Sequence, residues 1–233
     1  MATTVLTRTP SSAGNRRTFT WSFWVKRSNL ESSRTLFSVD TASGTTGFSA
    51  SYFLSTGELF IGVRESSGEK RLKTNQVFRD VSAWYHIVIA FDTTQSTGTD
   101  RIKLYVNGSQ VTSFAEQNDI TQNFDTSVNN TVRQDIGVYK NSSGSLNSYF
   151  DGSMAHVHLI DGTAYDASAF GETDSTTGIW KPKTAPSVTY GTNGFFLKFE
   201  NSGAFGTDSS GNSNTFTVNG TMTQTIDTPS NVF

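Results

Sequence analysis

The sequence predicts an all-β protein built as a two-sheet antiparallel β-sandwich. Aromatic residues make up 12% of the chain and charged residues only 16%, so Ser, Thr, Asn and Gly must supply most of the polar surface. Aromatic and β-branched residues suit a pleated sheet, whereas the usual helix formers are scarce. Short stretches of alternating apolar and polar residues recur along the chain, with turn dipeptides between them. Many short strands with regular turns are typical of a sandwich or a barrel.

The clearest alternation lies at residues 18–26, where Phe19, Trp21 and Phe23 fall on one face and mainly polar residues on the other. Period two over this length predicts a half-buried strand. Trp24 falls on the polar face, and we expect it to pack under a loop because tryptophan is usually largely buried. Residues 84–92 are apolar on both faces, which predicts a central strand.

The remaining strands are shorter and are separated by turn signals. They are predicted at residues 35–39, 47–54, 58–64, 70–74, 102–107, 110–114, 133–139, 153–160, 195–200 and 215–218. Asn107-Gly108 predicts a hairpin, because a type I′ turn needs two residues that tolerate positive φ. Asp166 can cap a single helical turn at residues 166–172, and residues 119–130 and 172–187 are expected to be long loops.

The whole chain, residues 1–233, is expected to form a single domain, since no clean boundary and no internal repeat is visible. Residues 201–233 are rich in Gly, Ser and Asn, as a linker would be, but they contain Phe205, Phe216 and Val218, which can pack. This segment either completes the sandwich or extends to a neighbouring subunit.

Charge and hydropathy exclude several classes of protein. The net charge is −2 with no basic tract, so we expect no nucleic-acid partner. No apolar run is long enough for membrane insertion, and polar residues 1–17 predict no signal peptide. Cysteine is absent, so packing and hydrogen bonds must supply the stability.

Three stretches resemble the laminin-G/pentraxin-like branch of the concanavalin A-like jelly rolls. The first is FTWSFWVK at residues 19–26. The second pairs WYHIVIAFD at residues 84–92 with IKLYVNG at residues 102–108. The third joins DIG at residues 135–137 to FDGSMAHVHL at residues 150–159. The resemblance implies a concanavalin A-like jelly roll, which fits the fold class predicted above.

Further segments are similar to virion proteins of marine bacteriophages. They are residues 6–17, residues 178–183 and residues 227–233. This resemblance implies a structural or adhesion component of a virion (a tail, fibre or capsid-surface protein) that is assembled in the host cytoplasm. The implied partners are other virion proteins, further copies of the chain as a homo-oligomer, and a host surface polysaccharide.

The motifs of catalysis are missing, so we expect a protein that is not an enzyme. Glycoside hydrolysis needs two carboxylates that flank the bond, and the Glu-x-Asp-x-x-Glu strand motif of the laminarinase-like relatives does not occur. There is no Gly-x-Ser-x-Gly elbow and no phosphate-binding loop. His156 and His158 are two residues apart and would share one face of a strand, which favours a satisfied surface pair over a metal site.

Calcium is the one cofactor that the resemblance to laminin-G and pentraxin domains suggests. Lys140 and Asn141 stand where the pentraxin pattern needs acids, which places the double-calcium site in doubt. Asp40, Asp92 and Asp151 could contribute to another site, although turn-capping aspartates at strand ends explain them as well.

A glycan site would combine an exposed aromatic ring with amide or carboxylate groups. Tyr139, Asn141 and Trp180 are the candidates because they lie in or beside predicted loops, and Trp180 could equally anchor a long loop to the sandwich. Three functions follow. The first is a virion structural or adhesion protein, the alternative is a stand-alone carbohydrate-binding lectin-like module, and the third is a glycoside hydrolase.

Overall fold

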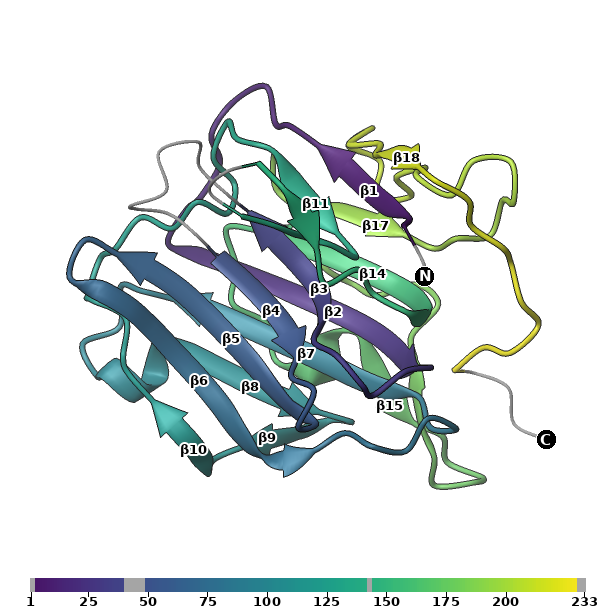
Figure 1. Cartoon of the computed structure of the whole chain (residues 1–233), viewed down its shortest axis with the longest axis horizontal. Coiled ribbons are helices and arrows are strands. Elements are labelled where there is room, and N and C mark those ends of the chain that lie inside the picture. The colour runs from purple at the N-terminus through teal and green to yellow at the C-terminus, as the bar shows by residue number, and fades with distance from the viewer. Residues whose placement is uncertain (1–2, 40–48, 142–143, 230–233) are drawn as a thin grey trace.

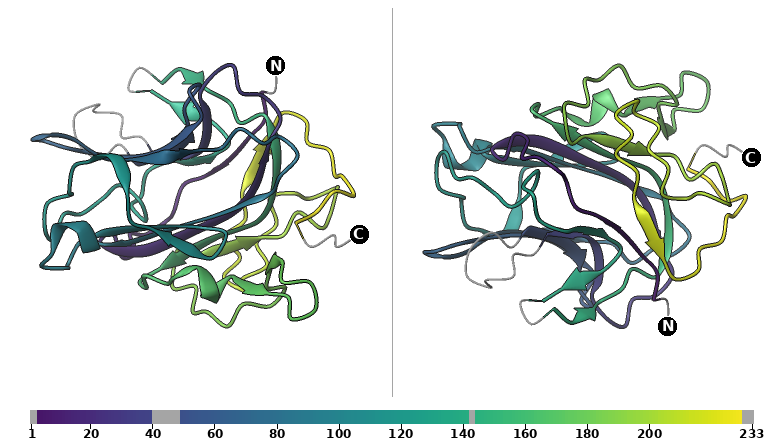
Figure 2. Two further views of the ribbon diagram at one scale, coloured as in Figure 1. Left: turned by 90° about the horizontal axis from the view of Figure 1, so that it is seen from below. Right: turned by 90° about the horizontal axis from the view of Figure 1, so that it is seen from above.

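The computed structural model describes residues 3–39, 49–141 and 144–229. Two antiparallel β-sheets, one of eight strands and one of six, pack face to face. Figure 2 shows the two layers edge-on. The apolar core lies between them. The predicted all-β sandwich is confirmed, and the only helices among the described residues are the short 3-10 turns η1 (Gly98–Asp100) and η2 (Ala167–Ala169). Neither is long and apolar enough to cross a membrane.

The eight-stranded sheet has the spatial order β10-β6-β5-β4-β3-β11-β1-β18. Its strands are β1 (Val5–Arg8), β3 (Arg34–Val39), β4 (Ser49–Phe53), β5 (Glu58–Glu65), β6 (Gly68–Val77), β10 (Phe114–Gln117), β11 (Gln134–Ile136) and β18 (Thr217–Asn219). The strand pairs of this sheet are antiparallel, and the first and last segments of the described chain meet where β18 pairs with β1 (Figure 1).

The six-stranded sheet has the order β17-β14-β2-β7-β8-β9. Its strands are β2 (Thr18–Arg27), β7 (Tyr85–Asp92), β8 (Ile102–Val106), β9 (Ser109–Val111), β14 (Gly152–Asp161) and β17 (Phe195–Leu197). The strand predicted at residues 18–26 is present, with Trp21 opposite Ile89 of β7 and Phe19, Trp21 and Phe23 in the core. The expectation that it is half-buried is wrong, because Thr20, Ser22 and Trp24 on its other face are buried as well. The predicted hairpin is also present, since Asn107 and Gly108 have φ of 47° and 86° between β8 and β9.

The outer face of the six-stranded sheet is covered by residues 162–194, which contain η2, β15 (Gly171–Thr173) and β16 (Trp180–Pro182). This cover explains why β7 is apolar on both faces: Val88 packs outward against Ile160, Ala167 and Phe170 in a second apolar cluster. Trp24 packs there as well, 2% exposed and stacked on a histidine of β7. The sequence showed this region only as a loop, because each of its strands is three residues long.

The C-terminal part contributes to both layers. β17 pairs with β14, β18 pairs with β1, and Phe205 and Phe216 are buried. Residues 221–229, here called the C-terminal strap, then run past the open side between the sheets, where the yellow segment lies in Figures 1 and 2. Residues 201–229 therefore lie against the same sandwich.

Candidate functional site

A pocket of about 450 Å³ lies at this open side of the sandwich. Its wall is built from β1, the end of β11, the first half of β14, the residues that follow β17, and the C-terminal strap. A pocket of this volume is in the range of ligand sites, which occur where a fold leaves a concave surface with a few polar groups. The side chains that matter below are Trp84, Asp151, His156, Lys198, Phe199, Glu200, Gln224 and Asp227.

The pocket exists because one strand stops early. β14 pairs with β2 over its whole length, but β17 pairs only with Val157–Leu159 on the other side. The chain leaves the sheet after Leu197 and adopts a left-handed conformation at Phe199, with φ of 61°. The edge of β14 at residues 152–156 therefore has no strand partner on this side among the described residues, and it forms one wall of the pocket. Such an edge carries backbone hydrogen-bonding groups that can bind a ligand.

Backbone strain is concentrated at this pocket. Seven described non-glycine residues have positive φ, and two of them line the pocket: His156, with φ of 46° at an irregularity in β14, and Phe199. Asn and His are enriched in this region, whereas a bulky residue such as Phe199 is a clear outlier. Phe199 is held there by its surroundings, and such strain gathers at functional sites.

One ring nitrogen of His156 is buried without a hydrogen-bond partner. Its Nδ1 is enclosed and no partner lies within reach among the described residues. Burial, and next the positive charge of Lys198, lower the pKa of His156, so the imidazole is neutral at pH 7. A neutral imidazole offers one donor and one acceptor, which suits an uncharged hydroxyl.

An aromatic ring and a carboxylate connect the pocket to the strap. The indole Nε1 of Trp84 donates to Oδ1 of Asp227 at 3.0 Å, which holds the half-buried ring at the pocket wall. Lys26 Nζ donates to the other oxygen of Asp227 at 2.6 Å. These hydrogen bonds, from Lys26 first and then Trp84, lower the pKa of Asp227. The strap is also held by Gln224, whose Nε2 donates to the carbonyl of Glu200 at 3.0 Å.

One residue predicted from the sequence, Asp151, lines this pocket. Its Oδ1 accepts from Ser28 Oγ at 2.9 Å, and its Oδ2 lies 3.9 Å from Arg34 Nη2. The other predicted site residues are not among those that line this pocket.

Trp180 lies over the outer face of the six-stranded sheet. Its Nε1 donates to Nδ1 of His86 at 3.0 Å, and its ring packs on Gly108 and Gly171, where a Cβ would approach the indole to 2.9 and 2.5 Å. Trp180 thus anchors the covering segment, as one of the two sequence interpretations expected.

Tyr139 and Asn141 lie in and beside the hairpin of β12 (Tyr139–Lys140) and β13 (Leu146–Asn147). This hairpin lies on the opposite side of the sandwich from the covering segment that contains β16 (Figure 2). Asn141 shapes the turn, since its Oδ1 accepts from the backbone of Ser145 at 2.8 Å. The structure therefore does not bring the three predicted glycan contacts together.

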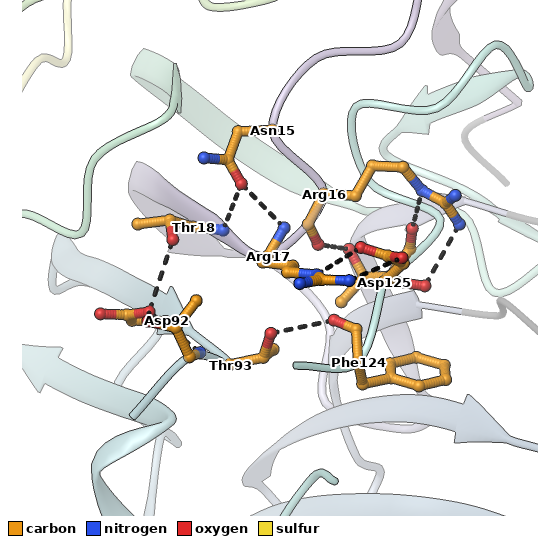
Figure 3. Close-up of polar contacts among 10 residues, drawn as sticks. Asn15, Arg16, Arg17, Thr18, Asp92, Thr93, Phe124 and Asp125 are labelled. Carbon is orange, nitrogen blue, oxygen red and sulfur yellow. Dashed lines mark hydrogen bonds and ion pairs between the residues drawn. The ribbon is translucent and has the colours of Figure 1, made fainter. Parts of the chain in front are cut away.

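Asp92 ends β7 and caps the following turn. Its Oδ1 accepts from Thr94 Oγ1 at 2.6 Å and from Thr18 Oγ1 at 3.4 Å, and its Oδ2 accepts from Gln95 Nε2 at 2.6 Å. Burial opposes ionisation, but the hydrogen bonds from Thr94 and Gln95 outweigh it and lower the pKa of Asp92. Figure 3 shows the Thr18 contact beside the Arg17–Asp125 ion pair, which joins the start of β2 to the loop before β11.

No three His, Asp or Glu side chains of the described residues are grouped so that they could hold a metal ion. Asp40 lies outside the described residues. His158 is buried and its Nδ1 lies 3.0 Å from the hydroxyl of Tyr190. Calcium binding by the chain stays a prediction.

Two antiparallel sheets with a ligand-sized pocket at their open side define a lectin-like β-sandwich. A laminin-G-type family model, described as the concanavalin A-like lectin/glucanases superfamily, matches residues 3–169. The chain belongs to this superfamily, and the resemblance noted in the sequence is confirmed at this level. A search of curated proteins finds no match.

Comparison with solved structures finds one module that shares the fold and two proteins that align less closely. The carbohydrate-binding module CBM40 of the Ruminococcus gnavus IT-sialidase aligns with a TM-score of 0.50 and 15% identity, over 66% of this chain and 80% of the module. A heptameric SAP-like pentraxin from Limulus polyphemus aligns with a TM-score of 0.47 and 18% identity, over 69% of this chain and 71% of the pentraxin. A leech intramolecular trans-sialidase aligns with a TM-score of 0.49 and 13% identity, over 71% of this chain and 26% of that enzyme.

Proposed function

We propose that the chain is a non-enzymatic carbohydrate-binding module of lectin type and that the pocket under the C-terminal strap holds the glycan. The observation that carries the proposal is the strained wall of this pocket. His156 and Phe199 are both held in the left-handed region, beside an unpaired edge of β14 and the half-buried ring of Trp84. Strain that the surroundings maintain at a pocket points to a functional site.

The chemistry of the wall suits a sugar. Sugars present apolar faces that stack on aromatic rings, and hydroxyls that pair with neutral or charged polar groups. Trp84 and Phe199 supply the rings, and Gln224, His156 and the β14 edge supply polar groups. Membership of a lectin superfamily supports this function, as does the similar fold of the carbohydrate-binding module CBM40.

The proposal includes the lack of catalytic activity, and the lowered pKa of Asp227 supports this part of it. Glycoside hydrolysis needs one carboxyl group whose pKa is raised, so that it can protonate the leaving oxygen. The pKa of Asp227 is lowered by its hydrogen bonds. Asp151 and Glu200 each lie beside a cation, at 3.9 Å from Arg34 and 3.6 Å from Lys198.

Replacement of Trp84 by alanine tests the proposal. A glycan array identifies ligands of the purified chain, and calorimetry then measures their affinity. We expect Trp84→Ala to weaken binding by about tenfold or more, because loss of a stacking ring removes about 1.5 kcal/mol. Trp84→Phe keeps a ring but not the N–H that holds Asp227, so it should retain most of the affinity.

Tyr139→Ala is the matched control, since it removes a ring from the hairpin on the far side of the eight-stranded sheet. If Tyr139→Ala abolishes binding while Trp84→Ala does not, the glycan site lies at the predicted hairpin and the pocket assignment is wrong. If no glycan in a broad set of bacterial polysaccharides binds, the carbohydrate-binding function itself is rejected.

We further propose that this module works as a structural or adhesion part of a bacteriophage virion, where it contacts other virion proteins and a host polysaccharide. The similarity of residues 6–17, 178–183 and 227–233 to virion proteins supports this role. Virion parts are usually symmetric oligomers, so the purified chain is expected to form a stable homo-oligomer. Light scattering at two concentrations measures the mass. A monomer at both, with no virion partner that retains it, would argue against assembly.

A further inference from the structure

The charges at the pocket indicate which glycans it accepts, and this inference rests on the proposed function. The described lining residues include a single cation, Lys198, and three carboxylates, Asp151, Glu200 and Asp227. The cation is already engaged: Lys198 Nζ lies 3.6 Å from Glu200 Oε1 and 5.5 Å from the ring centre of Phe196.

The cations behind the wall are engaged too. Lys26 Nζ lies 2.6 Å from Asp227 Oδ2, so it neutralises that carboxylate rather than an incoming group. Arg34 donates to the carbonyl of Tyr149 at 3.2 Å and faces Asp151 at 3.9 Å. Each of the three carboxylates thus has one cation beside it, and each cation has its carboxylate.

The remaining polar groups carry no positive charge. His156 is the histidine of the wall, and it is neutral at pH 7 because burial lowers its pKa. The amide of Gln224 donates to the carbonyls of Phe199 and Glu200. An acidic sugar would therefore bring a carboxylate among three others, with no cation free to pair with it. Burial of an unpaired charge is strongly unfavourable, whereas hydroxyls lose little when they exchange water for such partners.

We infer that the pocket accepts neutral sugars and rejects acidic ones such as sialic and uronic acids. The selection rests on the lack of a free cation, since the cations at the wall are already paired and an acidic sugar would lose water without gaining a partner of opposite charge. Glu200 is the position that sets this preference, because its removal would release Lys198.

Neutral and acidic sugars of related structure test the inference. The probes are lactose against 3′-sialyllactose, which adds one acidic sugar, and β1,4-mannan oligosaccharides against β1,4-mannuronan oligosaccharides, which carry a carboxylate in place of the C6 alcohol. Binding is measured by calorimetry at pH 7 and low salt. We expect the neutral member of each pair that binds to bind at least about tenfold tighter, the equivalent of about 1.4 kcal/mol. Glu200→Gln should lower the ratio of the affinities for the neutral and the acidic sugar by about threefold or more. The reason is that the freed Lys198 can pair with the carboxylate of the acidic sugar. Glu172→Gln, on β15, should leave the ratio unchanged.

An acidic member that binds as tightly as its neutral counterpart, with binding lost in Trp84→Ala, would overturn the inference while the glycan function stands. A neutral preference that Glu200→Gln does not alter would also overturn the assignment to these charges. Failure of every probe and of the wider glycan array would reject both the function and this inference, whereas neutral binding that Trp84→Ala weakens supports both.

Discussion

Replacement of Asp161 by asparagine is expected to lower the free energy of unfolding by about 3 kcal/mol, although the two side chains have nearly the same shape. Asp161 ends β14 and is 7% exposed. Its Oδ1 accepts from the backbone N–H of Asn15 at 2.6 Å and from Asn129 Nδ2 at 3.2 Å, and its Oδ2 accepts from the N–H of Asn193 at 2.9 Å. Three segments distant in sequence therefore meet on one carboxylate.

An asparagine cannot serve all three donors. Whichever way the amide is turned, its NH₂ group replaces one acceptor oxygen and faces an N–H that loses its partner. Hydrogen bonds to a charged group contribute about 1.5–3 kcal/mol, and a buried donor left unpaired costs about 1–3 kcal/mol. There is also no room to relax, because a Cβ on the adjoining Gly14 would come within 2.1 Å of the carboxylate.

Urea unfolding followed by tryptophan fluorescence measures the effect. Asp166→Asn is the matched control, since Asp166 caps η2 through its Oδ1, which accepts from the backbone of Ser168 at 2.8 Å. Asparagine caps about as well as aspartate, so this variant should change stability by less than about 0.5 kcal/mol. Equal losses in the two variants would show that the Asp161 junction does not stabilise the fold as described.

The strands that the sequence predicted well are long ones in which apolar and polar residues alternate. The alternation at residues 18–26 marks the strand Thr18–Arg27, although its polar face proved to be buried too. The covering layer of residues 162–194 could not be predicted in the same way, because its two strands of three residues are too short to show a period. Trp180 belongs to this layer, and only the structure shows that its N–H is directed at a buried histidine.

The pocket was harder to predict than the fold. Asp151 alone among the predicted site residues lines it. Trp84 and His156 stood in strands that the sequence did identify, but no spacing relates them to residues 221–229. The pocket also depends on where β17 ends, and the left-handed turn at Phe199 has no sequence signal because bulky residues rarely adopt it. The His156–His158 spacing was the one available hint, and it was set aside as a surface pair.

A second large effect is expected from pH. His86 of β7 is fully buried between β2 and the covering layer, and both ring nitrogens have partners. Trp180 Nε1 can only donate, so Nδ1 of His86 accepts from it at 3.0 Å. Nε2 therefore carries the proton and faces Ser22 Oγ at 2.9 Å. A second proton on Nδ1 would point at the indole N–H, so this site holds the imidazole neutral.

Burial, and next the charge of His156, lower the pKa of His86 to about 3. The unfolded chain binds a proton at this residue below about pH 6.5, and the folded chain does not until about pH 3. The contribution to stability is therefore complete above pH 6.5 and is lost as the pH falls through that window. Between pH 7 and 5 the loss is about 2 kcal/mol for His86. Burial also lowers the pKa of His158 well below its usual value, so a similar loss adds to it.

Urea unfolding at pH 7 and pH 5 measures this loss. The window lies above the range in which carboxylates with lowered pKa, such as Asp227, begin to take up protons, so histidines dominate it. His86→Gln retains a group that can accept from Trp180 but cannot titrate. The free energy of unfolding of this variant should be lower than that of the parent chain at pH 7. Between pH 7 and pH 5, however, it should decrease by about 2 kcal/mol less than that of the parent chain does. Parallel losses in both proteins would mean that His86 becomes protonated in the folded state, and the closed arrangement of Ser22, His86 and Trp180 would then be wrong.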